Sequence, residues 1–427
     1  MKSTTKWAGT ALAIAACSAF AAGCGSSSSS SSSTATPAAS SSAAAPSAAA
    51  LGTVNKATGT PITLGLLNLE TGPVTFPEYR QAAEAAVSYI NAYKGGIGGH
   101  PVKLATCATD GQPSTSSRCA SQVLNSKPVA ILGGADTGAP GAFPVYSRKN
   151  LAYLGGIPFT PVESNAPNAV QFYSVSVGDN LATVQYAVKD LGVKKASVIY
   201  TDDTQGKATG LGVIVPTLEK AGVTVKAVPV SPSAADLSSA AASAVSNSPD
   251  LVYVNSPNAC PALLKALQGV GNTAKIAGID PCTSPPALKA AGAAANNLYF
   301  AQPFDSLDSG TPDANLMLAA TAKYAPKTLA LDSIAQAGFS SVMNVQAALN
   351  DVKSLTTTNI LAAVKNGKSN ANFLAHNYDC NGKQLPGNTS ICNAYQRIKQ
   401  VQGSKIVTLP GGWVTGAAYF TPAVSKN

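Results

Sequence analysis

The stretch from residue 61 to 101 passes from an apolar run through a helical pattern to a second apolar run. The first run, ITLGLLNL, begins at Ile62 and stops at a Glu-Thr-Gly-Pro break. Runs this short, bounded by glycine and proline, are typical of buried parallel strands. Apolar residues then recur at helical spacing over 78–93, and Gly95 and Gly96 end the predicted helix. This strand-helix-strand unit predicts a parallel sheet with a right-handed crossover.

The same alternation continues in two series that meet near residue 177. Further strands are expected at 128–132, 151–154, 171–177, 196–200, 223–230, 251–254, 275–279, 298–301, 395–400 and 405–408. Helices are expected toward Arg148 and at 181–191, 210–220, 236–247, 262–270, 314–324, 333–352 and 358–365. The two series predict an α/β fold of two similar lobes, between which the chain crosses more than once. Ligands of such sheets bind beyond the carboxyl ends of the strands, and the first of these ends lies at residues 69–72.

The N-terminal segment has the pattern of an export signal. Lys2 and Lys6 precede a short apolar stretch, and Ala21-Ala22-Gly23-Cys24 resembles a lipoprotein processing site. We therefore predict a signal over 1–24, a lipid on Cys24 and a location on the outer face of the cell membrane. Processing at Cys17 and an ordinary secretory signal are the alternatives. Residues 25–60 are rich in Ser, Ala and Pro, which predicts a flexible tether.

Composition narrows the classes of function. Charged residues make up 11% of the chain, and its net charge of +9 would fall to +7 on removal of the two lysines of the signal. The basic residues are scattered rather than gathered on one stretch, which argues against nucleic-acid binding. The sequence has no G-x-S-x-G elbow, phosphate-binding loop or H-E-x-x-H motif, and it has only two histidines. We therefore predict neither an enzyme nor a cofactor or metal site.

Six cysteines follow Cys24 and fall into pairs that are close in sequence. Six cysteines allow 15 connectivities, but each neighbouring pair brackets a single turn, loop or strand-helix step. Disulfides persist in exported proteins, and each short loop closed here would add about 3 kcal/mol. The spacing favours the pairs Cys107–Cys119, Cys260–Cys282 and Cys380–Cys392.

Several segments, in this order, resemble a known family. They are the ITLGLL strand, GGIGGHPVKL at 95–104, VAILGGADTGA at 129–139, SVIYTDDTQGKATG at 197–210 and DLVYVNSPNACPALLKAL at 250–267. Together with the lipoprotein signal, they are similar to the type I periplasmic binding proteins, in particular the branched-chain amino acid substrate-binding proteins of ABC transporters. The resemblance spans about residues 61–420. It implies two Rossmann-like lobes with parallel sheets, joined by a hinge of three crossings.

The resemblance also implies how the chain is divided and where a ligand is held. Lobe one would comprise 61–176 and 304–392, and lobe two 177–303 and 393–427. The family's hydroxyl and backbone N–H groups that hold a ligand carboxylate fall on Thr137 and Gly138, where a helix N-terminus favours an anion. The family's acid that pairs with a ligand ammonium falls on Asp280.

Other positions of the family's pocket are altered in this sequence. The family's Ala-x-Thr element falls on Ile157-Pro158-Phe159, which has no threonine hydroxyl. The aromatic residue of lobe two falls on Gln205, and a second aromatic position falls near Pro257 and Asn258. The pocket implied by the resemblance therefore differs from a standard leucine or valine pocket.

The implied function is capture of a small amino-acid-like, polar or amphiphilic molecule between the lobes and its delivery to the permease of an ABC importer. A ligand-sensing module without transport is the alternative, because the same closure of the lobes would serve it. An exported enzyme is a third class, which the lack of a nucleophile-base motif disfavours.

Overall fold

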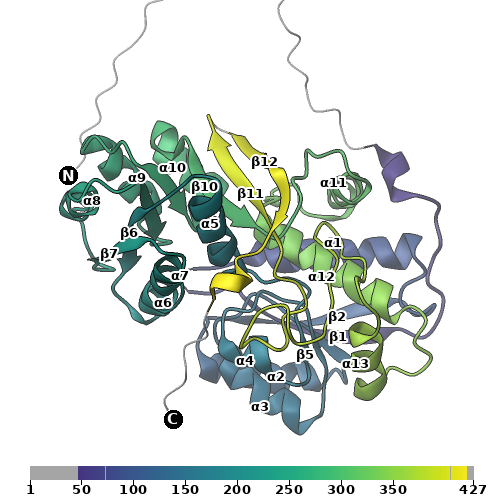
Figure 1. The fold of residues 1–427 in the computed structure, drawn as a ribbon. Helices are drawn as coiled ribbons and strands as arrows, with labels where there is room; N and C mark the ends of the chain where they lie inside the picture. The colour runs from purple at the N-terminus through teal and green to yellow at the C-terminus, as the bar shows by residue number, and fades with distance from the viewer. Residues whose placement is uncertain (1–46, 73, 404, 421–427) are drawn as a thin grey trace, which may run out of the picture. The chain divides into compact units, whose positions relative to one another are not determined.

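The computed structural model describes residues 47–72, 74–403 and 405–420 (Figure 1). The expected signal over 1–24, with Cys17 and Cys24, and the first part of the expected tether lie outside the described residues. The described chain is α/β and contains two sheets. Among its helices, none is long and apolar enough to cross a membrane.

The first sheet is parallel throughout and has the strand order β2-β1-β3-β4-β5. Its strands are β1 (Ile62–Leu69), β2 (Val102–Thr109), β3 (Ala130–Leu132), β4 (Tyr153–Leu154) and β5 (Ala169–Val170). Leu64 and Leu66 of β1 pack into one apolar cluster, and Leu67 packs into another on the opposite face. Burial on both faces explains why this strand is an almost continuous apolar run.

Helices from distant parts of the sequence cover the first sheet. They are α1 (Pro77–Tyr93), α2 (Pro113–Leu124), α3 (Ala139–Arg148), α4 (Pro161–Asn165), α11 (Pro312–Tyr324), α12 (Ser333–Leu349) and α13 (Thr357–Lys365). Helices α1 and α12 contribute to the same buried cluster as Leu64. A Cβ atom on Gly338 would lie 2.1 Å from the carbonyl oxygen of Tyr79, so the close approach of these two helices requires glycine at that position.

The second sheet has seven strands in the order β12-β11-β10-β9-β8-β6-β7. They are β6 (Lys195–Thr201), β7 (Thr224–Val230), β8 (Leu251–Asn255), β9 (Lys275–Gly278), β10 (Leu298–Gln302), β11 (Gln396–Gln402) and β12 (Lys405–Val414). Strand β11 pairs antiparallel with both β10 and β12. The expectation of parallel sheets in both lobes is therefore wrong for this edge, where β11 and β12 form a hairpin added to a parallel core.

Further helical segments accompany the second sheet. They are α5 (Val177–Lys189), α6 (Thr204–Thr209), a π-helical turn (Gly210–Ile214), α7 (Val215–Lys220), α8 (Ser238–Val245), α9 (Cys260–Gly269), η3 (Asp280–Thr283), α10 (Pro285–Ala291) and η4 (Gly292–Ala295). The chain passes between the two groups of elements three times: after β5, after β10 and before β11. The passes are bonded to one another, since Gln396 donates to the Ser174 carbonyl at 2.7 Å and Arg397 pairs with Asp305 at 2.7 Å.

Three local expectations differ from the structure. Residues 171–177 were expected to form a strand, but β5 ends at Val170 and only Gln171 continues the ladder, in a bridge to Ile391. Helix α2 was not anticipated, because its sequence is rich in serine; its buried positions Ser116, Cys119, Ala120 and Val123 have helical spacing but small side chains. The helix expected at 210–220 begins earlier, with α6, and contains the π-helical turn.

The expected tether, 25–60, does not extend to residue 60. A short 3₁₀ helix, η1 (Ala48–Leu51), places Leu51 in the apolar cluster of the first sheet, where it is 5% exposed. The backbone N–H groups of Asn55 and Ala57 donate to carbonyls near the end of α1 at 3.0 and 2.9 Å. One buried leucine and a few backbone hydrogen bonds therefore fix a segment whose composition predicts a flexible chain.

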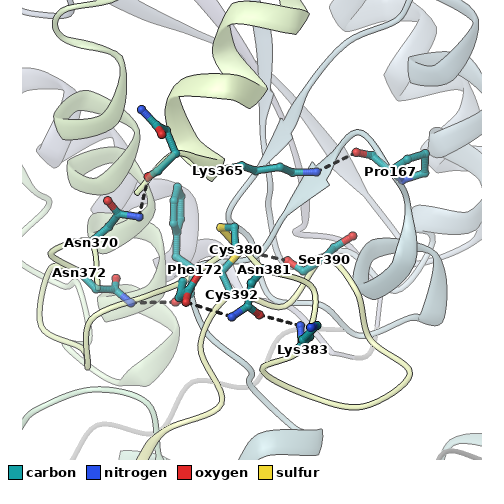
Figure 2. The surroundings of a disulfide bond; sticks show 12 residues. Pro167, Phe172, Lys365, Asn370, Asn372, Cys380, Asn381, Lys383, Ser390 and Cys392 are labelled. Carbon is teal, nitrogen blue, oxygen red and sulfur yellow. Dashed lines mark hydrogen bonds between the residues drawn. A yellow bond between two sulfur atoms is a disulfide. The ribbon is translucent and has the colours of Figure 1, made fainter. Parts of the chain in front are cut away.

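The structure contains the disulfides Cys107–Cys119, Cys260–Cys282 and Cys380–Cys392, the pairing that the spacing favours. The third lies in the segment between α13 and β11 (Figure 2). This segment is bonded to the chain that leaves β5: the N–H of Cys392 donates to the Gln171 carbonyl at 2.9 Å, and Asn372 donates to the Phe172 carbonyl at 2.8 Å. The disulfide thus holds together a loop that is bonded to the first of the three passes and leads into the third.

Candidate functional site

A cleft of about 1700 Å³ lies at the carboxyl ends of strands from both sheets. Leu69, at the end of β1, lines one side, and Thr201 and Asn255, at the ends of β6 and β8, line the other. The first turns of α5 and α12 complete the wall. Open α/β sheets bind ligands at this position, so the cleft is the candidate site.

The two residues expected to hold an anion lie in different environments. Thr137 is exposed and lines the cleft, and its hydroxyl donates to the Gly111 carbonyl at 3.3 Å. Gly138 is buried and is not part of the cleft wall. Its N–H donates at 3.0 Å to Oδ1 of Asp136, which also accepts from the hydroxyl of Thr109 at 2.8 Å. The N-terminus of α3 is therefore already occupied by a carboxylate of the protein itself.

The Ile157-Pro158-Phe159 element divides between the core and the cleft. Ile157 is fully buried in the apolar cluster of the first sheet and does not line the cleft. Phe159 lines the cleft and stacks on Phe76, with 5.8 Å between the ring centroids. The first sheet thus provides a pair of aromatic rings, whereas the position expected for an aromatic residue of the second lobe carries the exposed Gln205, which also lines the cleft.

Asp280 lines the cleft at the start of η3, just after β9. Its carboxylate accepts hydrogen bonds from Gln302 at the end of β10 and from Ser333 at the start of α12. The hydroxyl of Thr283 adds a longer bond of 3.2 Å and also donates to the Asp280 carbonyl at 2.7 Å. Asp280 therefore connects the second sheet to a helix that packs on the first, in addition to capping its own turn.

Other acids surround Asp280 and influence one another. Burial, and then the negative charge of Asp280, raises the pKa of Asp332 to about 6. Burial, and then the charges of Asp332 and Glu70, raises the pKa of Glu78 to about 7. Burial and the charge of Asp280 also hold the pKa of Asp179 well above its usual range. Glu78, Asp179, Asp280 and Asp332 all line the cleft, and we call these four residues the acidic cluster.

A buried lysine faces the acidic cluster. Nζ of Lys399, on β11, donates to Oε1 of Gln302 at 2.7 Å, and the Gln302 side chain in turn donates to Asp280. Burial lowers the pKa of Lys399 to about 8, although the charges of Asp280 and nearby acids oppose that shift. In the part of the chain that the structure describes, no group of three or more His, Cys, Asp or Glu side chains is arranged to hold a metal ion.

Residues 61–394 match the sequence model of a family described as periplasmic binding protein. The chain belongs to the periplasmic binding protein family. This family is extracytoplasmic and binds solutes. No protein of curated function matches the chain.

Solved structures of type I periplasmic binding proteins share the fold of this family member. A leucine-binding protein from Thermotoga maritima has 16% identity, covers 83% of this chain and 99% of its own, and gives a TM-score of 0.67. A fatty acid ABC transporter substrate-binding protein from Thermomonospora curvata has 18% identity, 83% and 94% coverage and a TM-score of 0.68. A branched-chain amino acid transporter substrate-binding protein from Streptococcus pneumoniae, in complex with isoleucine, has 16% identity, 82% and 100% coverage and a TM-score of 0.65.

The sequence does not identify most of the acidic cluster of this periplasmic binding protein as part of a site. Of its four members the resemblance implied only Asp280, as the position on which the family's acid for a ligand ammonium falls. Glu78 and Asp332 have the sequence signal of acids at a helix start, and Asp179 forms a capping box with Ser176. That signal is common, and it gives no indication that three separate helix starts meet in one cleft.

Proposed function

We propose that this periplasmic binding protein is a lipid-anchored solute-binding protein that captures a small molecule in the cleft and delivers it to the permease of an ABC importer. In this proposal the lobes are the predicted ones, 61–176 with 304–392 and 177–303 with 393–427. They close on the solute by motion at the three passes. Thr137, Phe159, Gln205 and Asp280 would contact the solute, whereas Gly138 and Ile157 would support the wall from behind.

The observation that carries this proposal is the position of the cleft. It lies at the carboxyl ends of strands from both sheets, and residues of both sheets line it. The Asp280–Ser333 bond supports closure, because a cleft-lining residue of one lobe already finds its partner on the other. The fatty acid and amino acid proteins that share the fold differ in their stated ligands, so the fold leaves the solute open.

Native mass spectrometry of the purified full chain tests the capture of a solute. We expect a small molecule to co-purify, and the radius of gyration in solution scattering should decrease when the emptied protein is given that molecule. A strain lacking the protein should lose high-affinity uptake of the same solute, whereas a sensing role would leave uptake intact and abolish a response to it. A protein that binds no solute by any of these measurements would refute the proposal.

The membrane anchor is tested separately. Cys24→Ala should release the protein from the membrane fraction or leave it as an unprocessed precursor, and Cys17→Ala serves as the matched control. A mature N-terminus without lipid would refute the anchor but leave the capture of a solute unaffected.

A further inference from the structure

The cleft is acidic although the chain is basic. The whole chain carries a net charge of +9, yet among the described residues that line the cleft seven are Asp or Glu and two are lysines, Lys289 and Lys399. Of these two, Lys399 is buried and bonded to Gln302. A cleft of this sign raises the local concentration of cations and repels anions.

Within the part of the chain that the structure describes, two buried side-chain oxygens on the cleft wall have no hydrogen-bond partner. Oδ1 of Asp179 and Oε1 of Gln336 are buried without a hydrogen bond, and their residues are 5% and 6% exposed. Gln336 lies one turn after Ser333 on α12, on the same side of the helix as the hydroxyl that donates to Asp280. A buried polar atom without a partner is costly, so both atoms are suited to hydrogen bonds with a bound molecule, and a bound cation would favour the ionised, accepting form of Asp179.

An apolar surface adjoins these acceptors. The stacked rings of Phe76 and Phe159 line the cleft, and Phe76 directly precedes α1, whose first turn carries Glu78. Leu331 and Ile334, on either side of Asp332, also line the cleft. Aromatic faces attract cations, and an aromatic pair beside carboxylates is suited to a cationic head on an apolar body.

We propose that the solute is an organic cation, a protonated amine or a guanidinium on an apolar or aromatic body that carries no carboxylate. This inference rests on the proposed function and specifies its substrate class. An amino acid would need an anion site in addition to the acids. At the expected place for that site, the N–H of Gly138 is occupied by Asp136 and is not exposed to the cleft.

Cation binding should release protons and strengthen as the pH rises. The raised pKa values of Asp332, about 6, and Glu78, about 7, leave these groups partly protonated near neutral pH. A bound cation favours their ionised forms, so affinity should increase between about pH 5 and about pH 8. The charged group that faces Asp332 is Asp280. Glu78 is faced by Asp332 and by Glu70, and Glu70 is itself paired with Arg80 at 2.7 Å.

Calorimetric titration with matched probe molecules tests whether the solute is a cation. We would use phenethylamine, phenethylguanidine and agmatine as cations, and phenylacetate, phenylalanine and 2-phenylethanol as the anionic, zwitterionic and neutral counterparts. Binding of at least one cation, tighter than that of every counterpart and with proton release in buffers of different ionisation enthalpy, is the expected result. Absence of cation binding, or tighter binding of any counterpart, overturns the inference. A co-purified amino acid or carboxylate would overturn it while leaving the proposed function standing.

Variants test whether the acidic cluster causes the binding of cations and the release of protons. Glu78→Gln and Asp332→Asn should each weaken binding of the tightest cation by about tenfold and reduce proton release. Asn caps helices as well as Asp does, so Asp332→Asn keeps the hydrogen bond to the Ala335 N–H. Asp236→Asn is the matched control, because Asp236 likewise accepts from a helix-start N–H, of Ser238, but lies outside the cleft wall. Equal affinities of all three variants and the native chain would overturn the inference.

Discussion

One carboxylate, Asp136, lies just before the start of α3, and another, Asp280, lies against the start of α12, but their hydrogen-bond partners differ. At α3, Asp136 accepts from Thr109 and from the N–H of Gly138, so its partners come from the same lobe. Around α12, Asp280 accepts from Gln302 in its own sheet and from Ser333 in the opposite group of elements. Among the described residues, Oδ2 of Asp136 is buried without a hydrogen-bond partner, and so are Oδ1 of Asp179 and Oε1 of Gln336 on the cleft wall.

The difference shows whether the groups at the start of α3 or those around the start of α12 are available to a solute. A helix N-terminus is a ready anion site only while its N–H groups are free, and at α3 the protein supplies the anion. At α12 the acids exceed the nearby cations, and their hydrogen bonds depend on two parts of the chain that closure would bring together. We therefore expect the α3 end to govern stability and the α12 end to govern binding.

The largest expected effect is that of Asp280→Asn. It removes the charge but nearly keeps the shape, and a charge-assisted bond of about 1.5–3 kcal/mol corresponds to a ten- to hundredfold loss of affinity. Titration of the identified solute measures that loss, and the melting temperature of the empty protein should change little. Asp136→Asn is the counterpart at α3, and it should lower the melting temperature while leaving affinity within about twofold. An unchanged affinity with a lowered melting temperature in Asp280→Asn would make this residue a turn cap only.

The next largest effect is expected from removing a disulfide, either the one beside Asp280 or one in the first lobe. Cys260–Cys282 ties the start of α9 to η3, which carries Asp280, whereas Cys107–Cys119 ties β2 to α2. Replacing either pair by alanine should lower the free energy of unfolding by about 3 kcal/mol. Only the loss of Cys260–Cys282 should also weaken solute binding several-fold, as calorimetry would reveal. Equal effects on affinity would mean that η3 does not depend on this bond.

Glu163, close to the α3 end, should control part of the pH dependence of stability. It is fully buried, and burial raises its pKa from 4.5 to about 8, against the hydrogen bonds from Thr160 at 2.9 Å. The folded state therefore keeps a proton that the unfolded chain loses near pH 4.5, so the free energy of unfolding decreases progressively as the pH rises from about 4.5 to about 8. Glu163→Gln cannot ionise, so its melting temperature should rise relative to the native chain by a few degrees over that range. A constant difference between the two proteins across pH would contradict this account.

Thr137→Ala should have the smallest effect. The hydroxyl makes one long bond, to the Gly111 carbonyl at 3.3 Å, on an exposed residue. We expect less than about a threefold change in affinity and a change in unfolding free energy within about 0.5 kcal/mol. A loss of more than tenfold would instead indicate a solute carboxylate at α3, and the contrast between the two ends would then fail.

The sequence by itself determined most of the architecture. Short apolar runs that end at glycine and proline marked the strands, since a strand buried on both faces must be apolar throughout, as β1 is. Local cysteine spacing favoured the three pairs that the structure contains. The family resemblance pointed to Asp280, and its position directly after an apolar strand agrees with that, because the carboxyl ends of parallel strands meet at one edge of a sheet.

Only the tertiary structure decided how these parts meet. The antiparallel pairing of β11 with β10 depends on a partner about 100 residues away, and the segment of Leu51 packs on α11, far along the chain; no local pattern encodes either contact. From the sequence alone, Gly138 and Ile157 are expected to line the cleft just as Thr137 and Phe159 are. Neighbouring residues can point in opposite directions, and the sequence does not show which of them face the cleft. Glu78, Asp179 and Asp332 each have the sequence signal of an acid at a helix start, and they become a cluster only because three helices begin at the same cleft.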